Sequence, residues 1–335
     1  MKSMLIAAGL LVILARSAAA DPVTLRFAPG QNAPVNQTDV ANFYRLWADR
    51  VTNDSKGALK IDVREGFAIA NSLNMYDRVT SDVIQIGFVL FNYVEGKFPL
   101  TEVAALPNTA DNAADGSRAL WRLYQSGMLD KEFDTVRPLL LVALPQSIVH
   151  LRSAPKSLED LTGQRIVGPT QMTGLAAKYM GAQTISLPSN AAYEAINRGT
   201  ADGTILSFNV YFTFKIGEVT HYHIDQPMGT AAGMIFMTRK VYDGLPADAK
   251  AALDKNSGEA ASAEWGSWWD RDNATNREIA KKDASQTVVT LPPQIAASWT
   301  KRLDAADAEW MKSRPGAERA LAKYKQYLAD IAAGR

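Results

Sequence analysis

The chain has 335 residues, with 36 Lys and Arg, 35 Asp and Glu, 3 His and no cysteine. The absence of cysteine excludes disulfides, thiolate metal sites, cysteine nucleophiles and an acylated N-terminal cysteine. The formal net charge is +1, with no basic stripe and no long run of one charge, so we expect neither a nucleic-acid surface nor a charged tail.

The first 20 residues have the pattern of a secretory signal peptide. Lys2 supplies the positive start, residues 4–15 are an apolar run, and the alanines at 18–20 fit a small-residue cleavage site. The run is too short to span a bilayer as a mature helix. We therefore expect an exported, periplasmic protein that begins near Asp21, with an uncleaved anchor as the alternative.

Strand and helix patterns then alternate along the chain. Residues 23–30 read as a strand that ends at a Pro-Gly break, and residues 40–53 place apolar side chains on one helical face. Residues 59–66 form a second strand and residues 73–81 a further helix. Residues 83–90 are a continuous apolar run, typical of a parallel strand buried on both faces. This alternation predicts an α/β fold with a parallel sheet flanked by helices.

The second half continues the pattern. Residues 164–167 read as a strand that breaks at Gly168-Pro169 just before a new helix, which is where α/β proteins usually hold ligands. A strand at 232–239 and helices at 247–279 and 295–332 follow.

A weak internal repeat relates the segments that start at Tyr76 and Tyr193. Both run through a helix into a strand and deliver Phe-Asn at the same end. Few positions are identical, so coincidence is the alternative. Two lobes built on one plan would suit a ligand held between them, with the repeated pairs in the cleft: Phe91 and Asn92, Phe208 and Asn209.

Four segments resemble, in order, the solute-binding proteins of tripartite ATP-independent periplasmic (TRAP) transporters, the DctP family. They are GKFPLTEVAALP (96–107), SLEDLTGQRI (157–166), AINRGTADGTI (195–205) and MIFMTRKVYDGLPADAKAAL (234–253). The resemblance implies a protein that captures a small solute without catalysis or a cofactor, and we expect it to be a monomer. It also implies delivery to a small and a large integral membrane subunit, driven by an ion gradient.

The fold implied by the resemblance is the two-lobed periplasmic binding protein fold, or flytrap, with crossing strands and a long C-terminal helical region. On this plan residues 21–147 and 232–272 form lobe I. Residues 148–231 and 273–335 form lobe II.

The chain departs from the family at its usual charged anchor. Most members read K-I-R-V-P in the strand after L-K-G, and the arginine pairs with a substrate carboxylate. Aligning residues 161–163 with L-K-G puts Val167 at that arginine and Arg165 at the preceding lysine. Arg152, where the chain first crosses between lobes, becomes the candidate cation for an acid. A solvated surface arginine is the alternative.

Residues 202–209 follow the DGxxxPWE layout of a subgroup associated with aromatic and other lipophilic acids, with Phe208 for the tryptophan and Asn209 for the glutamate. Aromatic residues near strand ends predict an apolar cleft, with ordinary core packing as the alternative for each. The predicted substrate-binding residues are Arg152, Gln171, Val167, Phe91, Asn92, Tyr93, Phe208, Asn209, Tyr211 and Phe67.

Two other readings stay open. The solute could be uncharged or carry an amine, because Val167 replaces the arginine. The chain could also be an exported enzyme on a similar fold, but no Ser-His-Asp order, supported carboxylate pair or nucleotide fingerprint stands out. His221 and His223 share one face without a third ligand, so we expect a structural role and no metal site.

Overall fold

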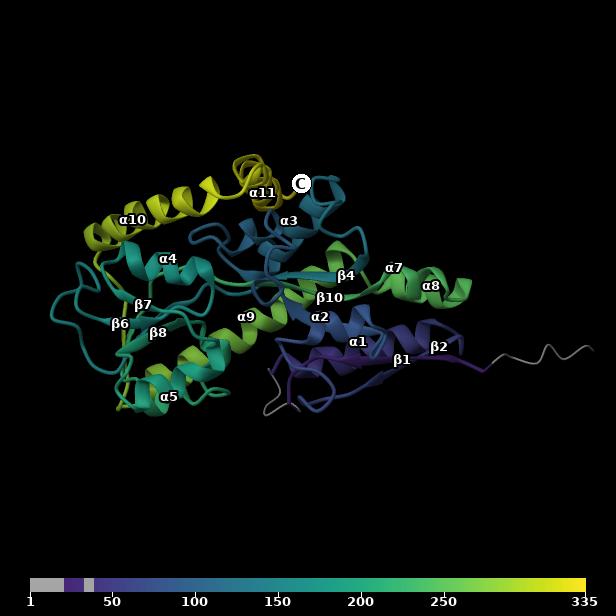
Figure 1. Ribbon diagram of the computed structural model, residues 1–335, viewed down its shortest axis with the longest axis horizontal. Coiled ribbons are helices and arrows are strands. Elements are labelled where there is room, and N and C mark those ends of the chain that lie inside the picture. The colour runs from purple at the N-terminus through teal and green to yellow at the C-terminus, as the bar shows by residue number, and fades with distance from the viewer. Residues whose placement is uncertain (1–20, 33–38) are drawn as a thin grey trace, which may run out of the picture.

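The computed structural model describes residues 21–32 and 39–335, so the predicted signal peptide lies outside the described residues. Two α/β lobes lie side by side, each built on its own sheet (Figure 1). This arrangement agrees with the two-lobed class that the sequence predicts.

Lobe I contains a five-stranded sheet in the order β2-β1-β3-β10-β4. Strands β1, β2 and β3 are parallel, whereas β10 runs antiparallel to both β3 and β4. The strands are β2 (Leu59–Val63), β1 (Val23–Ala28), β3 (Ile86–Leu90), β10 (Ala232–Thr238) and β4 (Val136–Ala143). The α-helices of this lobe are α1 (Ala41–Asp54), α2 (Met75–Thr80), α3 (Ala113–Gln125), α7 (Arg239–Asp243) and α8 (Ala247–Lys255).

Lobe II contains a six-stranded sheet in the order β11-β9-β5-β8-β6-β7. Strand β5 runs antiparallel to both of its neighbours, β8 and β9. The strands are β11 (Thr287–Val289), β9 (Tyr222–Ile224), β5 (Ile148–Leu151), β8 (Gly203–Leu206), β6 (Arg165–Val167) and β7 (Gln183–Ile185). The helices that follow these strands are α4 (Gln171–Tyr179), α5 (Ala192–Asn197) and α6 (Ile216–Val219).

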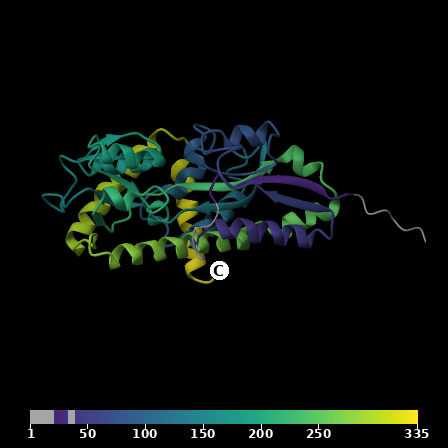
Figure 2. The ribbon, with the colours of Figure 1, turned by 90° about the horizontal axis from the view of Figure 1, so that it is seen from below.

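The chain passes between the lobes through extended segments and one long helix. Strand β4 leads into β5, and β9 leads back into β10. Helix α9 (Glu259–Lys282) runs along both lobes (Figure 2). It buries Trp265 and Trp269 in the core of lobe I and Ala280 in the core of lobe II, so its apolar face ties the two cores together.

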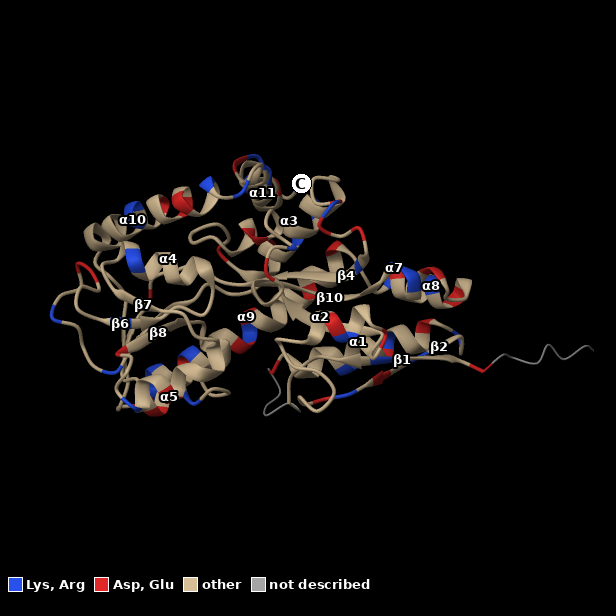
Figure 3. Cartoon of the chain, viewed as in Figure 1, with Lys and Arg blue, Asp and Glu red and all other residues tan. Residues whose placement is uncertain are grey.

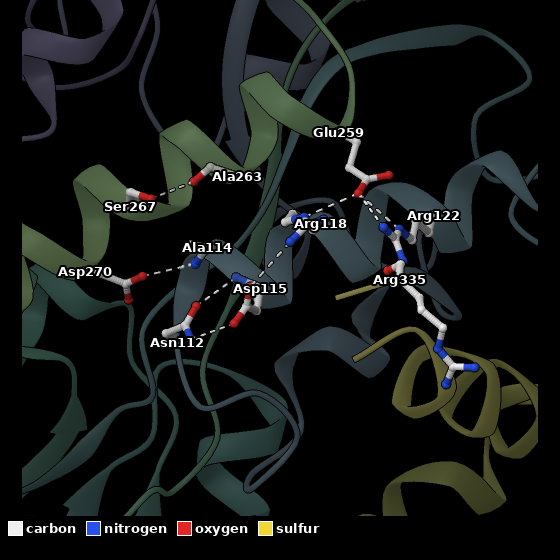
Figure 4. A network of polar contacts seen from close by, with 10 residues as sticks. All are labelled: Asn112, Ala114, Asp115, Arg118, Arg122, Glu259, Ala263, Ser267, Asp270 and Arg335. Carbon is white, nitrogen blue, oxygen red and sulfur yellow. Dashed lines mark hydrogen bonds and ion pairs between the residues drawn. The ribbon is translucent and has the colours of Figure 1, made fainter. Parts of the chain in front are cut away.

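Polar contacts fix α9 against α3 (Figure 4). The carboxylate of Asp270 accepts hydrogen bonds from the backbone N–H groups of Ala113, at 2.8 Å, and Ala114, at 3.0 Å, which satisfies donors at the start of α3. The close approach of α9 to the start of α3 depends on Gly266, because a Cβ there would meet the Ala113 carbonyl oxygen at 2.4 Å. At the other end of α3, Glu259 accepts from Arg122 Nη2 at 2.9 Å.

The C-terminal helices divide between the lobes. Helix α10 (Pro293–Lys312) packs on α4 of lobe II, but α11 (Ala317–Ala332) packs on α3 of lobe I. The buried Tyr324 hydroxyl donates to the Gly116 carbonyl at 3.1 Å. The packing of α11 on lobe I thus differs from the predicted assignment of residues 273–335 to lobe II. Gly316, with φ of +93°, lies where the chain turns from one helix to the next.

Charged side chains of both signs are interspersed on α7, α8 and α10 (Figure 3). Within residues 21–32 and 39–335, no helix is long and apolar enough to cross a membrane.

Candidate functional site

A cleft of two adjoining chambers lies between the lobes. The larger chamber has a volume of about 460 Å³ and the smaller about 300 Å³, and both volumes include open solvent at the mouth. Four residues line both chambers, so the chambers adjoin there: Asn92, Thr170, Thr230 and Ala231.

The ends of three strands build the larger chamber. Leu90 ends β3 in lobe I, and Leu206 ends β8 in lobe II. Pro169 and Thr170 follow β6, and Ser147 lies on the crossing segment before β5. Ligands of α/β proteins bind at such carboxyl ends, as the break after residue 167 predicts.

The larger chamber combines apolar walls with hydroxyl groups. Its apolar residues come from both lobes: Leu90, Leu144, Pro169, Ile205, Leu206 and Val210. Its Ser and Thr residues are Ser147, Thr170, Thr173, Ser189, Ser207 and Thr230. Among the described residues that line the two chambers there is no Lys or Arg, and Glu102 is the one acid.

Three of the predicted residues line the cleft. Asn92 borders both chambers, and its Oδ1 is buried without a hydrogen-bond partner. Tyr93 lines the larger chamber from lobe I. Burial raises the pKa of Tyr93, opposed by hydrogen bonds from the side chain and backbone of Ser189 in lobe II. Gln171 lines the smaller chamber and accepts from Arg314 Nη2 at 2.5 Å.

Thr170 gives the start of α4 a defined geometry. Its Oγ1 accepts from the Thr173 backbone N–H at 3.0 Å, and the Thr173 hydroxyl accepts in turn from the Thr170 backbone N–H at 3.0 Å. This capping box holds α4 with its positive end toward the cleft, because Thr170 and Gln171 are lining residues.

Val167 lies behind the chamber wall. Its side chain is fully buried in the core of lobe II, in the same cluster as Leu206 and Phe208, and it lines neither chamber. Its carbonyl accepts from the buried Thr204 hydroxyl at 3.1 Å. The prediction that Val167 contacts the solute directly therefore does not match its position.

Arg152 lies at the wrong end of the sheet for a carboxylate anchor. Strand β5 is antiparallel to β8, so Ile148 is opposite Leu206 near the cleft and Leu151 is opposite Gly203 at the far end. Arg152 follows Leu151, and its Nη2 donates to the Ile196 carbonyl at 2.6 Å. This position does not match the predicted role of Arg152 as a substrate-binding cation.

The predicted aromatic residues other than Tyr93 do not line the chambers. Phe91 packs on Phe98 and Phe133 in the core of lobe I, with ring centroids 4.7 and 6.2 Å away. Phe67 is 50% exposed on the loop after β2. Phe27, on β1, is fully buried in a core cluster of lobe I.

The second Phe-Asn pair supports lobe II and α9. Phe208 and Tyr211 are buried against each other, and burial raises the pKa of Tyr211 to about 12. Asn209 Nδ2 donates to the Trp269 carbonyl at 2.8 Å and to Asp272 Oδ2 at 3.3 Å. Asn209 therefore fastens the end of β8 to α9, whereas its counterpart Asn92 borders the cleft.

Two of the three histidines, His150 and His223, form a buried pair. His150 and His223 approach through their Nδ1 atoms at 2.8 Å, and burial lowers the pKa of His150 well below its usual value. His150 Nε2 contacts the Leu206 carbonyl at 3.1 Å. In the described ranges no group of three or more His, Cys, Asp or Glu residues could hold a metal ion.

Sequence reasoning missed the hydroxyl residues of the cleft and Glu102. Ser147, Ser207 and Thr230 lie on strand ends and crossing segments, where small polar residues are common and carry no distinguishing pattern. Thr170 could have been predicted from the sequence, because it directly follows the strand break at Gly168-Pro169. A helix N-cap in that position is common in ligand-binding loops.

The family assignment is direct. The sequence model of the family described as bacterial extracellular solute-binding protein, family 7 (DctP), matches residues 30–313. The chain belongs to this family, as the four sequence segments predict.

Two curated relatives match over part of their length. A solute-binding protein of Albidiferax ferrireducens is 22% identical over 215 residues, which is 62% of this chain and 63% of that protein. The C4-dicarboxylate-binding periplasmic protein DctP of Rhodobacter capsulatus is 28% identical over 140 residues, which is 42% of this chain and 41% of that protein. The matches thus span less than two thirds of either relative.

Solved structures match over nearly the whole chain. A TRAP solute-binding protein from Rhodoferax ferrireducens, in complex with copurified benzoate, has a TM-score of 0.83 and 28% identity, covering 92% of this chain and 98% of that one. A marine metagenome TRAP solute-binding protein specific for aromatic acid ligands, with 3-hydroxybenzoate, has a TM-score of 0.84 and 23% identity at the same coverage. These likenesses confirm the two-lobed periplasmic binding protein fold.

Proposed function

We propose that this protein is the periplasmic solute-binding subunit of a TRAP transporter and that its solute is a small aromatic or otherwise lipophilic carboxylate. The protein captures the solute between its lobes, without turnover, and delivers it to a small and a large integral membrane subunit. Family membership supports the transport role. The 28% identical relative with copurified benzoate supports the class of solute.

The larger chamber is the observation that carries this proposal. Leu90 and Leu144 face it from lobe I, and Leu206 and Val210 face it from lobe II. A flat ring between these walls contacts both lobes at once, and a ligand that contacts both lobes favours the closed arrangement.

Neutral donors hold the carboxylate in this proposal. Ser147, Ser207 and Thr170 offer hydroxyls, and the positive end of α4 adds a favourable field. A hydrogen bond to a charged group contributes about 1.5–3 kcal/mol, so a few such contacts can replace one guanidinium. The lack of Lys and Arg among the described lining residues equally favours an uncharged solute, which is the second candidate.

A thermal-shift and calorimetry panel separates these candidates. The compounds are benzoate, mandelate, succinate, benzamide and benzylamine. We expect benzoate or mandelate to raise the melting temperature, with about 2.7 kcal/mol of stabilisation at a hundred times the dissociation constant. Binding of benzamide or benzylamine without either acid would overturn the acid proposal. Recovery of unchanged ligand, checked by mass spectrometry, tests the absence of turnover.

Single hydroxyl deletions test how the acid is held. Ser147→Ala and Ser207→Ala should each weaken benzoate binding about tenfold or more, because each removes a donor to a charged group. Ser153→Ala, at an exposed position beyond β5, is the matched control and should leave affinity unchanged.

A further inference from the structure

The smaller chamber presents a carboxylate to its contents. Glu102, in the 3-10 turn η2 (Thr101–Ala105) of lobe I, lines this chamber together with Gln171 and Trp310 from lobe II. Its side chain is 22% exposed. Burial raises the pKa of Glu102, Arg314 opposes that shift and Glu132 adds to it.

Arg314 lies behind the chamber wall but leaves the carboxylate incompletely paired. Its Nη2 donates to Gln171 Oε1 at 2.5 Å, and its Nη1 donates to the Trp310 carbonyl at 3.1 Å. The approach to Glu102 Oε2 is 3.5 Å, which is long for a charged hydrogen bond. A carboxylate accepts about four hydrogen bonds, so Glu102 has capacity for a donor from the chamber.

Asn92 gives the junction of the chambers a second acceptor. It lines both chambers, and its Oδ1 has no hydrogen-bond partner. No Lys or Arg lines either chamber in the described part of the chain, so Glu102 has no cation within the lining to pair with.

We propose that Glu102 is a specificity-determining residue that accepts a hydrogen bond from a hydroxyl or protonated amino group on the end of the solute that enters the smaller chamber. In this proposal the larger chamber holds the ring, and the substituent extends past the shared lining residues Asn92, Thr170, Thr230 and Ala231. This inference rests on the proposed function for the place where the solute binds, and it adds the substituent that the site selects.

Matched pairs of compounds test the inference by isothermal titration calorimetry. One pair is benzoate and 3-hydroxybenzoate, and the other is the uncharged pair benzamide and 3-hydroxybenzamide. The proteins are the wild type, Glu102→Gln and Glu102→Ala, with Glu95→Gln as the matched control because Glu95 is exposed on a neighbouring loop of lobe I. Thermal unfolding of each variant verifies that it is folded.

The wild type should bind the hydroxylated member of a pair about tenfold or more tightly, the scale of one hydrogen bond to a charged group. Glu102→Gln should reduce this advantage and Glu102→Ala should abolish it, with affinity for the plain member retained. Glu95→Gln should retain the full advantage.

The absence of a hydroxyl advantage in the wild type, or an equal loss for both members of a pair in the variants, would overturn the role of Glu102. If the amides bind and the acids do not, the acid proposal fails while the amide pair still decides the role of Glu102. If none of the four compounds binds, both proposals are overturned.

Discussion

Arg165 and Asp202 form a bidentate ion pair at the start of β6, with Nε to Oδ2 at 2.9 Å and Nη2 to Oδ1 at 2.7 Å. Asp202 Oδ2 also accepts from the Arg165 backbone N–H at 2.9 Å. Strand β6 thus carries its arginine at the end away from the cleft, and Val167 ends the strand next to the cleft loop. A shift of register that moved Arg165 into the cleft would break this pair.

Removal of the Arg165 guanidinium should affect stability and not binding. We expect Arg165→Met to lower the free energy of unfolding only slightly, because the pair is bidentate but partly exposed. Denaturant unfolding measures this change. Benzoate affinity should be unchanged in Arg165→Met and in Arg152→Met, and a sharp loss in either variant would place a cation in the cleft.

Phe208 should act through the core of lobe II. Its ring is 2% exposed and contacts the rings of His150 and Tyr211 at centroid distances of 5.2 and 5.4 Å. Phe208→Ala should therefore lower the free energy of unfolding by about 3–5 kcal/mol, the usual cost of such a cavity. Phe67→Ala, at a half-exposed position, is the control and should change neither stability nor affinity. Normal stability with weakened binding in Phe208→Ala would instead place this ring at the solute.

The contact between Tyr93 and Ser189 should stabilise the closed arrangement of the lobes. Tyr93→Phe and Ser189→Ala each remove one of the two hydroxyl groups at this contact, and one hydrogen bond of this kind contributes about 0.5–1.5 kcal/mol. Each variant should weaken solute binding by a similar amount, and the double variant should cost less than the sum because the two residues share one contact. Strict additivity in a calorimetric double-mutant cycle would show that the contact does not contribute.

Asp307 should make stability depend on pH. Burial raises its pKa from 3.8 to about 7, with Lys325 opposing and Asp304 adding, and its Oδ1 has no hydrogen-bond partner. As pH rises, the Asp307 carboxyl therefore stays protonated to a higher pH in the folded state than in the unfolded state. Its contribution to the free energy of unfolding is full below about pH 4 and is lost as pH rises through about 7.

Asp307→Asn should raise the melting temperature relative to the wild type at pH 8, and the gain should shrink toward pH 4. The exposed Asp304→Asn is the matched control and should show no comparable dependence. A gain that is the same at both pH values would contradict a raised pKa at Asp307.

The sequence by itself determined the class of fold and the family. Periods of alternating strand and helix are local, so they predict strands near 23–30, 59–66 and 83–90 that the structure forms at slightly shorter bounds. The four family segments identify the DctP family. The same alignment places a valine at the position of the family's arginine, and no lysine or arginine replaces it in the described lining.

Only the tertiary structure decided which side chains face the cleft. Phe91 and Tyr93 are two residues apart in one turn, yet one packs in the core and the other borders the chamber, because their surroundings come from distant segments. The antiparallel pairing of β5 with β8 moved Arg152 to the far end of the sheet, and the turn at Gly316 returned α11 to lobe I. Strand pairing and helix packing join residues far apart in the chain, and a local pattern contains no information about them.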